Sequence, residues 1–280
     1  MQDGEALAGA ISQLRNQGIE SPRLDAELLL AHVLGVNRAA VLTWPERRLT
    51  PKQLTHFRAM TARRASREPL AYVLGQREFF GLEFAVNPAV LIPRPETELM
   101  VEHTLRLAGR FAKPLYIADV GAGSGAIAVT LAVRLPEATV YALDASTEAL
   151  VVVTENARRH SVSERVPCLQ SDLLTALPAP VDLITANLPY VTSEEWEGLT
   201  PEIRLFEPRA ALDGGPDGLD LIRRLLATAA PHLNPGGAIL LEIGASQGAA
   251  VTTLARELFP LADVQLVPDY AGLDRLVIIS

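Results

Sequence analysis

The sequence predicts an α/β fold in which a mostly parallel sheet follows a small helical domain. Three observations lead to this prediction. The first 75 residues carry only helical patterns, residues 76–93 are dense in apolar side chains with turn signals, and from residue 94 onward helix and strand patterns alternate. We therefore expect a helical domain over residues 1–75, a β-hairpin or extended connector over 76–93, and an α/β domain over 94–280.

The N-terminal domain is expected to consist of short helices. Leu7, Ile11 and Leu14 recur on one face of a helix over residues 3–17. Ser21-Pro22 and Thr50-Pro51 each combine a capping residue with a proline at the first helical position, which predicts helices over 23–34 and 52–66. Nothing in this part of the sequence indicates chemistry, so its surface suits packing or the binding of a partner.

The connector is predicted from its aromatic residues and its turn signals. Phe79, Phe80 and Phe84 are three of the seven phenylalanines of the chain, and Gly81 and Asn87-Pro88 interrupt the apolar run. Apolar segments separated by glycine and by Asn-Pro are typical of a hairpin or of extended chain.

The α/β domain is predicted from regular alternation. The expected helices cover residues 96–108, 126–134, 147–160, 218–232 and 246–258, and the expected strands cover 115–120, 139–144, 166–171, 181–187, 238–243, 264–267 and 275–279. Strands joined through helices form a mostly parallel sheet by right-handed crossovers, with helices on both faces.

Composition narrows the class of function. The chain has 280 residues, of which 49% are hydrophobic, and a net charge of −8. Proteins that bind nucleic acid usually carry a basic stripe. The one cationic run, Arg58 to Arg67, is typical of a solvated helix face, so we expect no stable binding of nucleic acid. Cys168 is the single cysteine and the five histidines are scattered, which excludes a disulfide framework and predicts no metal site.

The chain is expected to be cytoplasmic and to have no membrane segment. Its N-terminus lacks the basic-then-apolar pattern of a signal peptide. No uncharged apolar run approaches the roughly 20 residues that span a bilayer.

A glycine-rich turn is the first candidate for a binding site. Gly121-Ala122-Gly123-Ser124-Gly125 follows the strand over 115–120, and ligands of open α/β sheets bind at such strand ends. The turn alone is a weak signal, because the dinucleotide fingerprint has its third glycine one place later. Asp144 ends the next strand, where its carboxylate can accept hydrogen bonds from both ribose hydroxyls of an adenosine. The alternative is a tight turn with a helix cap.

A further acid ends the strand after that one. Asp172 can reach an adenine amino group, with Leu173 against the ring. The alternative here is an aspartate that closes a turn or caps a helix.

The most specific signal is Asn187-Leu188-Pro189-Tyr190, which ends the strand over 181–187. An amide nitrogen is a poor nucleophile, so a site that transfers a group to it must hold it firmly. The Asn187 side-chain oxygen and the Leu188 carbonyl can each accept an N–H of the reacting group. Pro189 stiffens the turn and Tyr190 can stack on a planar group. Catalysis then rests on positioning and electrostatic alignment, and no strong base is needed.

The chain resembles the class I S-adenosylmethionine-dependent methyltransferases with an Asn/Asp-Pro-Pro-Tyr motif. More narrowly, it is similar to the protein-(glutamine-N5) methyltransferases that modify peptide chain release factors. Besides the two motifs above, the segments that carry this resemblance are Arg67–Gly75, Phe79–Leu82, Leu91–Glu98, Glu207–Leu212 and Gly214–Gly218, in the order of the family and over nearly the whole chain.

The resemblance implies a Rossmann-like seven-stranded sheet with the last strand antiparallel, beside a helical domain that docks the substrate. It implies methyl transfer from S-adenosylmethionine to the glutamine of a Gly-Gly-Gln loop. Gly121 to Gly125, Asp144, Asp172, Leu173 and Asn187 would bind the cofactor, and Asn187 to Tyr190 would hold the glutamine. Residues Arg94 to Glu98 would line the pocket near the methionine end of the cofactor, where Arg94 and Glu98 would also bind substrate. A monomer suits an enzyme that docks a large protein.

The chain departs from the family pattern at one position of the clamp. Leu188 stands where the family has a first proline. Its carbonyl is still available, so we expect the same reaction with a modest effect on rate.

Two other interpretations remain open at this point. An adenine-N6 nucleic-acid methyltransferase uses a similar clamp on a flipped base, although the acidic charge disfavours it. A binding module could also use the sheet as a scaffold without catalysing anything, because a fold does not imply an activity.

Overall fold

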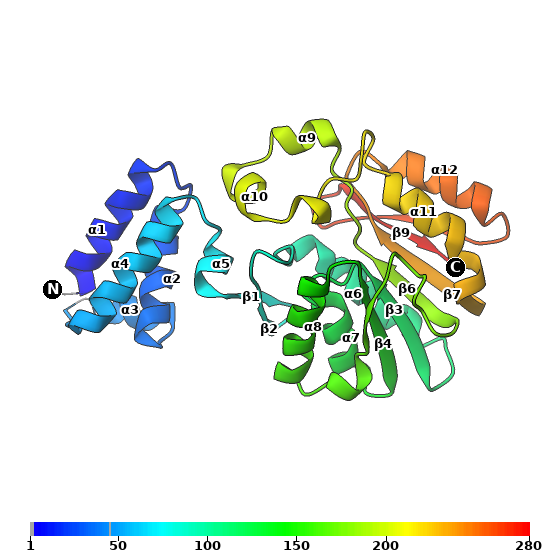
Figure 1. Cartoon of the computed structure of the whole chain (residues 1–280), viewed down its shortest axis with the longest axis horizontal. Coiled ribbons are helices and arrows are strands. Elements are labelled where there is room, and N and C mark those ends of the chain that lie inside the picture. Colours follow the sequence, from blue (N-terminus) through cyan, green and yellow to red (C-terminus); the bar gives the residue numbers. More distant parts are fainter. Residues whose placement is uncertain (1–2, 45) are drawn as a thin grey trace. The chain divides into compact units, whose positions relative to one another are not determined.

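The computed structural model describes residues 3–44 and 46–280, and the chain separates into two compact units (Figure 1). One unit contains Met1–Gln76 together with Thr200–Phe206, and the other contains Arg77–Leu199 and Glu207–Ser280. The segment Thr200–Phe206, which the sequence places within the α/β domain, therefore groups with the N-terminal helices.

The smaller unit is helical, as predicted. Its helices are α1 (Asp3–Asn16), α2 (Pro22–Leu34), α3 (Arg38–Thr43), α4 (Pro51–Ala65) and α5 (Leu70–Leu74), and α10 (Pro201–Phe206) joins them. Leu14, Leu29 and Phe57 form the centre of its core. Arg64 lies between two carboxylates, at 2.7 Å from Asp25 and 3.1 Å from Glu202 of α10, so this unit also contains a largely buried ionic cluster.

The two predicted helix caps differ in the structure. Thr50 forms a full capping box with Gln53, as its sequence indicates. Ser21 precedes Pro22 at the start of α2, but its hydroxyl makes no capping hydrogen bond, so the prediction of a side-chain cap there is wrong. The proline alone marks that helix start, because its fixed φ suits the first helical position.

The larger unit begins with the predicted hairpin, formed by β1 (Gln76–Phe79) and β2 (Leu82–Ala85). Phe79 and Phe84 pack edge to face, with ring centroids 6.1 Å apart, and both belong to the core of this unit. The aromatic residues of the hairpin thus anchor it to the unit that contains the main sheet.

The main sheet has seven strands in the order β5-β4-β3-β6-β7-β9-β8, and only β9 runs antiparallel to its neighbours. This confirms the predicted fold class. The strands are β3 (Leu115–Val120), β4 (Ala138–Asp144), β5 (Cys168–Gln170), β6 (Val181–Ala186), β7 (Leu233–Glu242), β8 (Val264–Pro268) and β9 (Asp274–Ile279).

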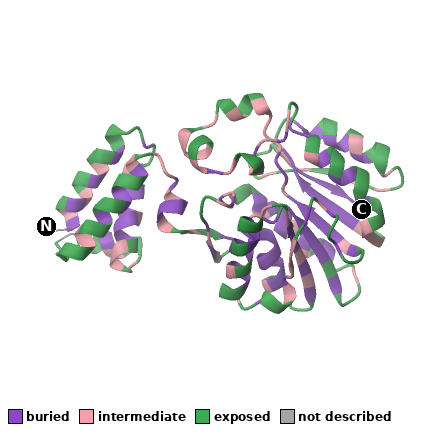
Figure 2. Cartoon of the chain, in the orientation of Figure 1, coloured by how far each residue is buried: buried purple, intermediate pink, exposed green. Residues whose placement is uncertain are grey.

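Helices cover both faces of the sheet, and the inner strands are mostly buried, whereas the two edge strands β5 and β8 are partly exposed (Figure 2). Side chains from α6 (Glu98–Ala108), α7 (Ala126–Arg134) and α8 (Thr147–Arg159) pack with Ile117 and Val140 on one face. On the other face, α11 (Asp220–Ala229) and α12 (Gly248–Leu258) pack with Ala118 and Ile184. Neighbouring strand residues thus point to opposite layers, as the two-residue period of a strand requires.

Element boundaries are where the sequence predictions were least accurate. The short helices α3, α9 (Ser193–Glu197) and α10 were not predicted, because five or six residues carry too little periodicity. Strand β7 begins at Leu233 rather than at residue 238, and β5 covers three residues instead of six. Helix α11 begins at Asp220 rather than 218, because Gly218 has a φ of +73° and cannot belong to the helix.

Two groups of features are absent from the described part of the chain. Among residues 3–44 and 46–280, no helix is both long enough and apolar enough to cross a membrane. Within the same ranges, no three histidine, cysteine, aspartate or glutamate side chains gather as a metal site would need.

Candidate active site

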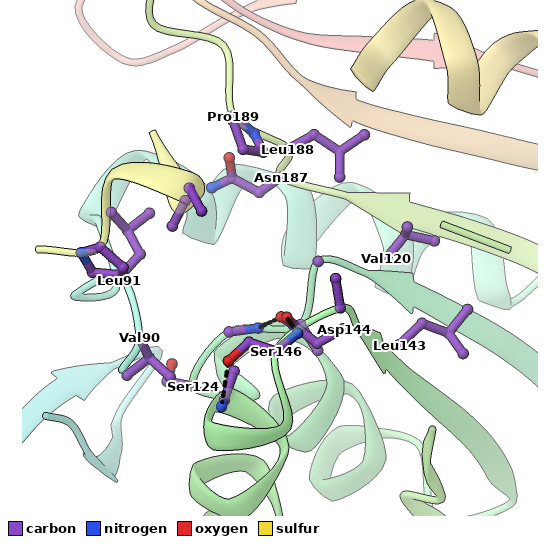
Figure 3. Close-up of a pocket in the computed structure, with 18 of the residues that line it drawn as sticks. Val90, Leu91, Val120, Ser124, Leu143, Asp144, Ser146, Asn187, Leu188 and Pro189 are labelled. Atoms are coloured by element: carbon purple, nitrogen blue, oxygen red, sulfur yellow. Dashed lines mark hydrogen bonds between the residues drawn. The ribbon is translucent and has the colours of Figure 1, made fainter. Parts of the chain in front are cut away.

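The carboxyl ends of β3, β4 and β6 border one pocket of about 310 Å³. This volume falls in the range of small-molecule sites, which start at roughly 300 Å³. The sequence-predicted residues that line it are Arg94, Gly121, Ala122, Gly123, Ser124, Asp144, Asp172, Leu173, Asn187, Leu188 and Pro189. In Figure 3 the stretch Asn187–Pro189 lies on one side of the open space, and Asp144 with Ser146 lies on the other.

The glycine turn places backbone against the pocket. The amides of Gly121 and Ala122 both donate to the Leu143 carbonyl, at 2.8 and 3.0 Å, which ties the turn to the end of β4. Gly125 has a φ of +78°, and a Cβ there would lie 2.9 Å from the Val153 side chain. Gly125 is not among the residues that line the pocket. A glycine is needed there because α7 and α8 approach each other closely.

Asp119 supports this turn from beneath. Its carboxyl accepts hydrogen bonds from the Thr185 hydroxyl at 2.9 Å and from the Ala128 amide at 3.1 Å, which joins β3, β6 and α7. Complete burial raises the pKa of Asp119 to about 7. The sequence contained this residue within the glycine motif but did not indicate a role for it.

Asp144 is oriented by backbone donors. Its Oδ2 accepts from the Gly123 amide at 2.8 Å and its Oδ1 accepts from the Ser146 amide at 2.9 Å. A carboxylate oxygen has two lone pairs, so each oxygen keeps one for a ligand. The arrangement fits the prediction that this group binds two hydroxyls of a ribose.

Asp172 and Leu173 both line the pocket, but their contributions differ. The Asp172 carboxylate pairs with Arg224 at 2.6 Å and is largely exposed, which leaves one oxygen without this ion pair. Leu173 has a φ of +52°, a conformation that few residues other than glycine adopt. That backbone turn brings Leu173 to the pocket, where it can lie against a flat ring.

The clamp residues lie directly after β6. The Asn187 Nδ2 group donates to the Thr97 hydroxyl at 3.1 Å, so the donor end of the amide is already occupied. Leu188 is buried, and its side chain packs close to Gly121. A Cβ atom at Gly121 would lie only 3.2 Å from the Cδ2 atom of Leu188. The leucine that replaces the family's proline therefore packs against the glycine turn.

Tyr190 is the last residue of the predicted clamp. It is not among the residues that line the pocket, and its hydroxyl donates to Glu242 Oε1 at 3.3 Å. Burial, with the nearby charge of Glu242, raises the pKa of Tyr190 well above its usual value, so the phenol stays protonated. The structure gives this tyrosine a hydrogen-bonding role at the back of the clamp.

Arg94 and Glu98, both predicted to bind substrate, separate in the structure. Arg94 lines the pocket and pairs with Glu207 at 2.6 Å. Glu207 is buried and also accepts from the Ile92 amide at 3.0 Å. Glu98 does not line the pocket, because its carboxylate accepts from the Phe80 amide of the hairpin turn at 2.9 Å.

Three site residues had no individual signal in the sequence, namely Thr97, Glu207 and Glu242. Thr97 lies in the stretch Arg94–Glu98, which was expected to line the pocket, and it does line it, but it had no role of its own. Glu207 lies in a segment that carries the family resemblance and had no assigned role. Glu242 ends the buried strand β7, and its acidic side chain after an apolar run was the only available signal.

Comparisons with known proteins identify two families in the chain. Residues 5–75 match the PrmC N-terminal domain, and residues 96–204 match the methyltransferase small domain. The release factor glutamine methyltransferase of Moorella thermoacetica is 46% identical over 97% of this chain and 95% of its own length. The protein of the same name from Geobacter sulfurreducens is 43% identical, over 94% of this chain and 91% of its own length.

Solved structures agree on the fold. The hMettl16 catalytic domain superposes with a TM-score of 0.60 at 17% identity, over 79% of this chain and 81% of that one. At 17% sequence identity, this similarity indicates a shared fold and nothing about the substrate.

Proposed function

Because the chain belongs to the release factor glutamine methyltransferase family, we propose that it methylates the side-chain amide nitrogen of a glutamine in peptide chain release factors. The methyl donor is S-adenosylmethionine, and the acceptor is the glutamine of the Gly-Gly-Gln loop. The observation that carries this proposal is the near-complete match to such enzymes, at 46% identity over 97% of the chain, together with an amide-binding clamp at the pocket.

The pocket fits the methyl donor. The glycine turn lets backbone approach a ligand closely, the oriented Asp144 carboxylate suits the ribose of a nucleoside, and Leu173 offers an apolar surface for its base. We assign cofactor binding to Gly121–Ser124, Asp144, Asp172, Leu173 and Asn187, with Gly125 supporting the turn. When bound, S-adenosylmethionine supplies an electrophilic methyl group on a sulfonium.

Asn187 to Tyr190 hold the glutamine in this proposal, and Asn187 and Leu188 supply the two acceptors. The Asn187 Nδ2 group is occupied by Thr97, so its Oδ1 is the end left to accept an N–H from the substrate amide. The Leu188 carbonyl accepts the second N–H. Two acceptors on the same nitrogen restrict its rotation and direct its lone pair, which supplies catalysis by positioning. The positive charge that develops on nitrogen is also stabilised by these oxygens, and its proton then leaves without a strong base.

The remaining expectations concern the setting of the enzyme. We propose that it acts as a cytoplasmic monomer, that the helical domain over residues 1–75 docks the release factor, and that nucleic acid is not bound stably. The net charge of −8 supports the last point, since binding to phosphates requires a basic surface.

The proposal is tested by transfer of labelled methyl from S-adenosylmethionine to purified release factor. The matched control is the same factor with Gln→Ala in its Gly-Gly-Gln loop, and duplex DNA provides a third arm. Label on the wild-type factor alone is the expected result. Label on DNA would instead favour the adenine-N6 methyltransferase, and label on the Gln→Ala factor would show that another residue is modified.

A further inference from the structure

The buried carboxyl of Glu242 is connected to both ends of the clamp, Asn187 and Tyr190. Glu242 closes strand β7 and is only 2% exposed. On one side, its Oε1 accepts from the Tyr190 hydroxyl at 3.3 Å. On the other side, hydrogen bonding by the Thr97 hydroxyl lowers the pKa of this carboxyl, and Thr97 in turn accepts from Asn187 at 3.1 Å. One carboxyl therefore connects Asn187, through Thr97, with Tyr190.

The direction of these hydrogen bonds decides which end of the Asn187 amide faces the substrate. A hydroxyl has one hydrogen, so Thr97 can accept from Asn187 while donating that hydrogen elsewhere. An ionised carboxylate only accepts, and Glu242 is the acidic neighbour that receives it. Its buried Oε2 has no hydrogen-bond partner among the described residues, so it is the oxygen left to receive this hydrogen. With Nδ2 held by Thr97, the Asn187 Oδ1 is left to face the pocket.

We propose that Glu242 is a positioning residue for methyl transfer, which fixes the Asn187 amide through Thr97 and fixes the end of the clamp through Tyr190. This inference rests on the proposed function, because it concerns how the clamp presents an acceptor to the glutamine nitrogen. Glu242 does not line the pocket, so it acts through Thr97 and Tyr190 and makes no contact of its own with a ligand bound there.

Protonation of Glu242 reverses the hydrogen-bond direction. A protonated carboxyl can donate to Thr97, whose own hydrogen then turns toward Asn187 and favours the flipped amide. A flipped amide presents N–H groups to the N–H groups of the substrate, which is repulsive. The side chains that act on Glu242 are Thr97 and Glu96 near the start of α6, Tyr190 after β6, and Arg275 of β9. Burial outweighs the attraction of Arg275 and raises the pKa of Glu242 to about 7. Turnover should therefore fall as the pH drops through about 7.

The experiment compares the full-length wild type with Glu242→Gln, Thr97→Val and the double variant, measuring release factor methylation from pH 6 to 9. Glutamine at 242 keeps the size but carries donors of its own. We expect kcat at pH 8 to fall about tenfold in each single variant, with the KM for release factor and the Kd for S-adenosylmethionine within about twofold of the wild type. The acid limb near pH 7 should disappear in Glu242→Gln.

The double variant separates a connected chain of hydrogen bonds from two independent contacts. Thr97 and Glu242 act through the same chain of hydrogen bonds. The double variant should therefore lose no more activity than whichever single variant loses more. The control is Glu155→Gln on the exposed surface of α8, which removes one charge far from these contacts and should keep the wild-type pH profile. Thermal melting of each variant checks that it is folded, and Thr97→Val decides the question if Glu242→Gln does not fold.

Three outcomes would overturn the inference: wild-type kcat in Glu242→Gln, an unchanged acid limb in that variant, or fully additive losses in the double variant. Each of these leaves the proposed function intact, because the wild type would still methylate the factor. If the wild type itself transfers no methyl group, the proposed function fails and the positioning role fails with it.

Discussion

The two sides of the pocket are built in different ways. The side that we propose binds the cofactor consists of consecutive backbone groups from Gly121 to Ser124 and one carboxylate, Asp144, which the amides of Gly123 and Ser146 orient. The clamp side depends on side chains from three distant segments, Thr97, Asn187 and Glu242. A site made from local backbone leaves a contiguous pattern in the sequence, whereas a site made from distant side chains becomes visible only when the chain has folded.

The comparison is tested most severely at Asn187. Asn187→Ala removes the acceptor that holds the reacting nitrogen, and we expect turnover to fall by about a thousandfold while the fold is kept. The measurement is kcat for release factor methylation. Asn234→Ala is a matched control, because its amide binds Asp182 at 2.8 Å and does not line the pocket. Wild-type turnover in Asn187→Ala would contradict the assignment of the clamp.

Asp144 should give the opposite kinetic result. Asp144→Ala removes a charged acceptor remote from the reacting nitrogen, so we expect S-adenosylmethionine to bind about 10- to 100-fold more weakly. Turnover at saturating donor should change much less. Calorimetric titration measures the affinity, and Asp182→Ala provides a carboxylate control at the amino end of β6. A large loss of kcat with unchanged affinity would show that the two sides of the pocket are not separable.

Substitution of Gly125 tests why this position is glycine. The reason can be its left-handed backbone alone, or also the close packing of α8 against it. A Cβ at Gly125 would lie 2.9 Å from Val153, whereas one at Gly272 would meet nothing within 4 Å, although both glycines have φ near +80°. Alanine at either position pays for the backbone conformation, about 1 kcal/mol. We expect Gly125→Ala to lose about 1–2 kcal/mol more in unfolding free energy than Gly272→Ala, measured by urea denaturation. Equal losses would show that α7 and α8 adjust without cost.

Leu188→Pro should have the smallest effect. Proline restores the stiffness of the family's turn, but it removes part of the contact that Leu188 makes with the glycine turn. Because these changes oppose each other, we expect kcat to stay within about threefold of the wild type. Methylation rates at saturating substrates measure this. A tenfold change in kcat in either direction would mean that one effect dominates, either the added stiffness of the turn or the lost contact with the glycine turn.

The sequence by itself determined the fold class and predicted the residues that we propose bind the cofactor. Alternating patterns predicted the order of the strands along the chain, since burial on two faces and helical crossovers leave strong periodic signals. The glycine turn and Asp144 could be identified for a similar reason, because φ angles above zero at Gly121 and Gly125 restrict the residue type locally. The clamp was likewise found as four consecutive residues, Asn187 to Tyr190.

Only the tertiary structure decided which side chains support that clamp and which of the predicted residues line the pocket. Glu98 bonds to the hairpin and the Tyr190 hydroxyl bonds to Glu242, and neither residue lines the pocket, while their contacts with substrate stay predictions. Thr97 and Glu242 are 145 positions apart in the chain and meet only because η1 (Pro95–Thr97) and the end of β7 come together in the folded unit. Hydrogen-bond direction and burial are properties of such meetings, so no local pattern of residue types could have specified them.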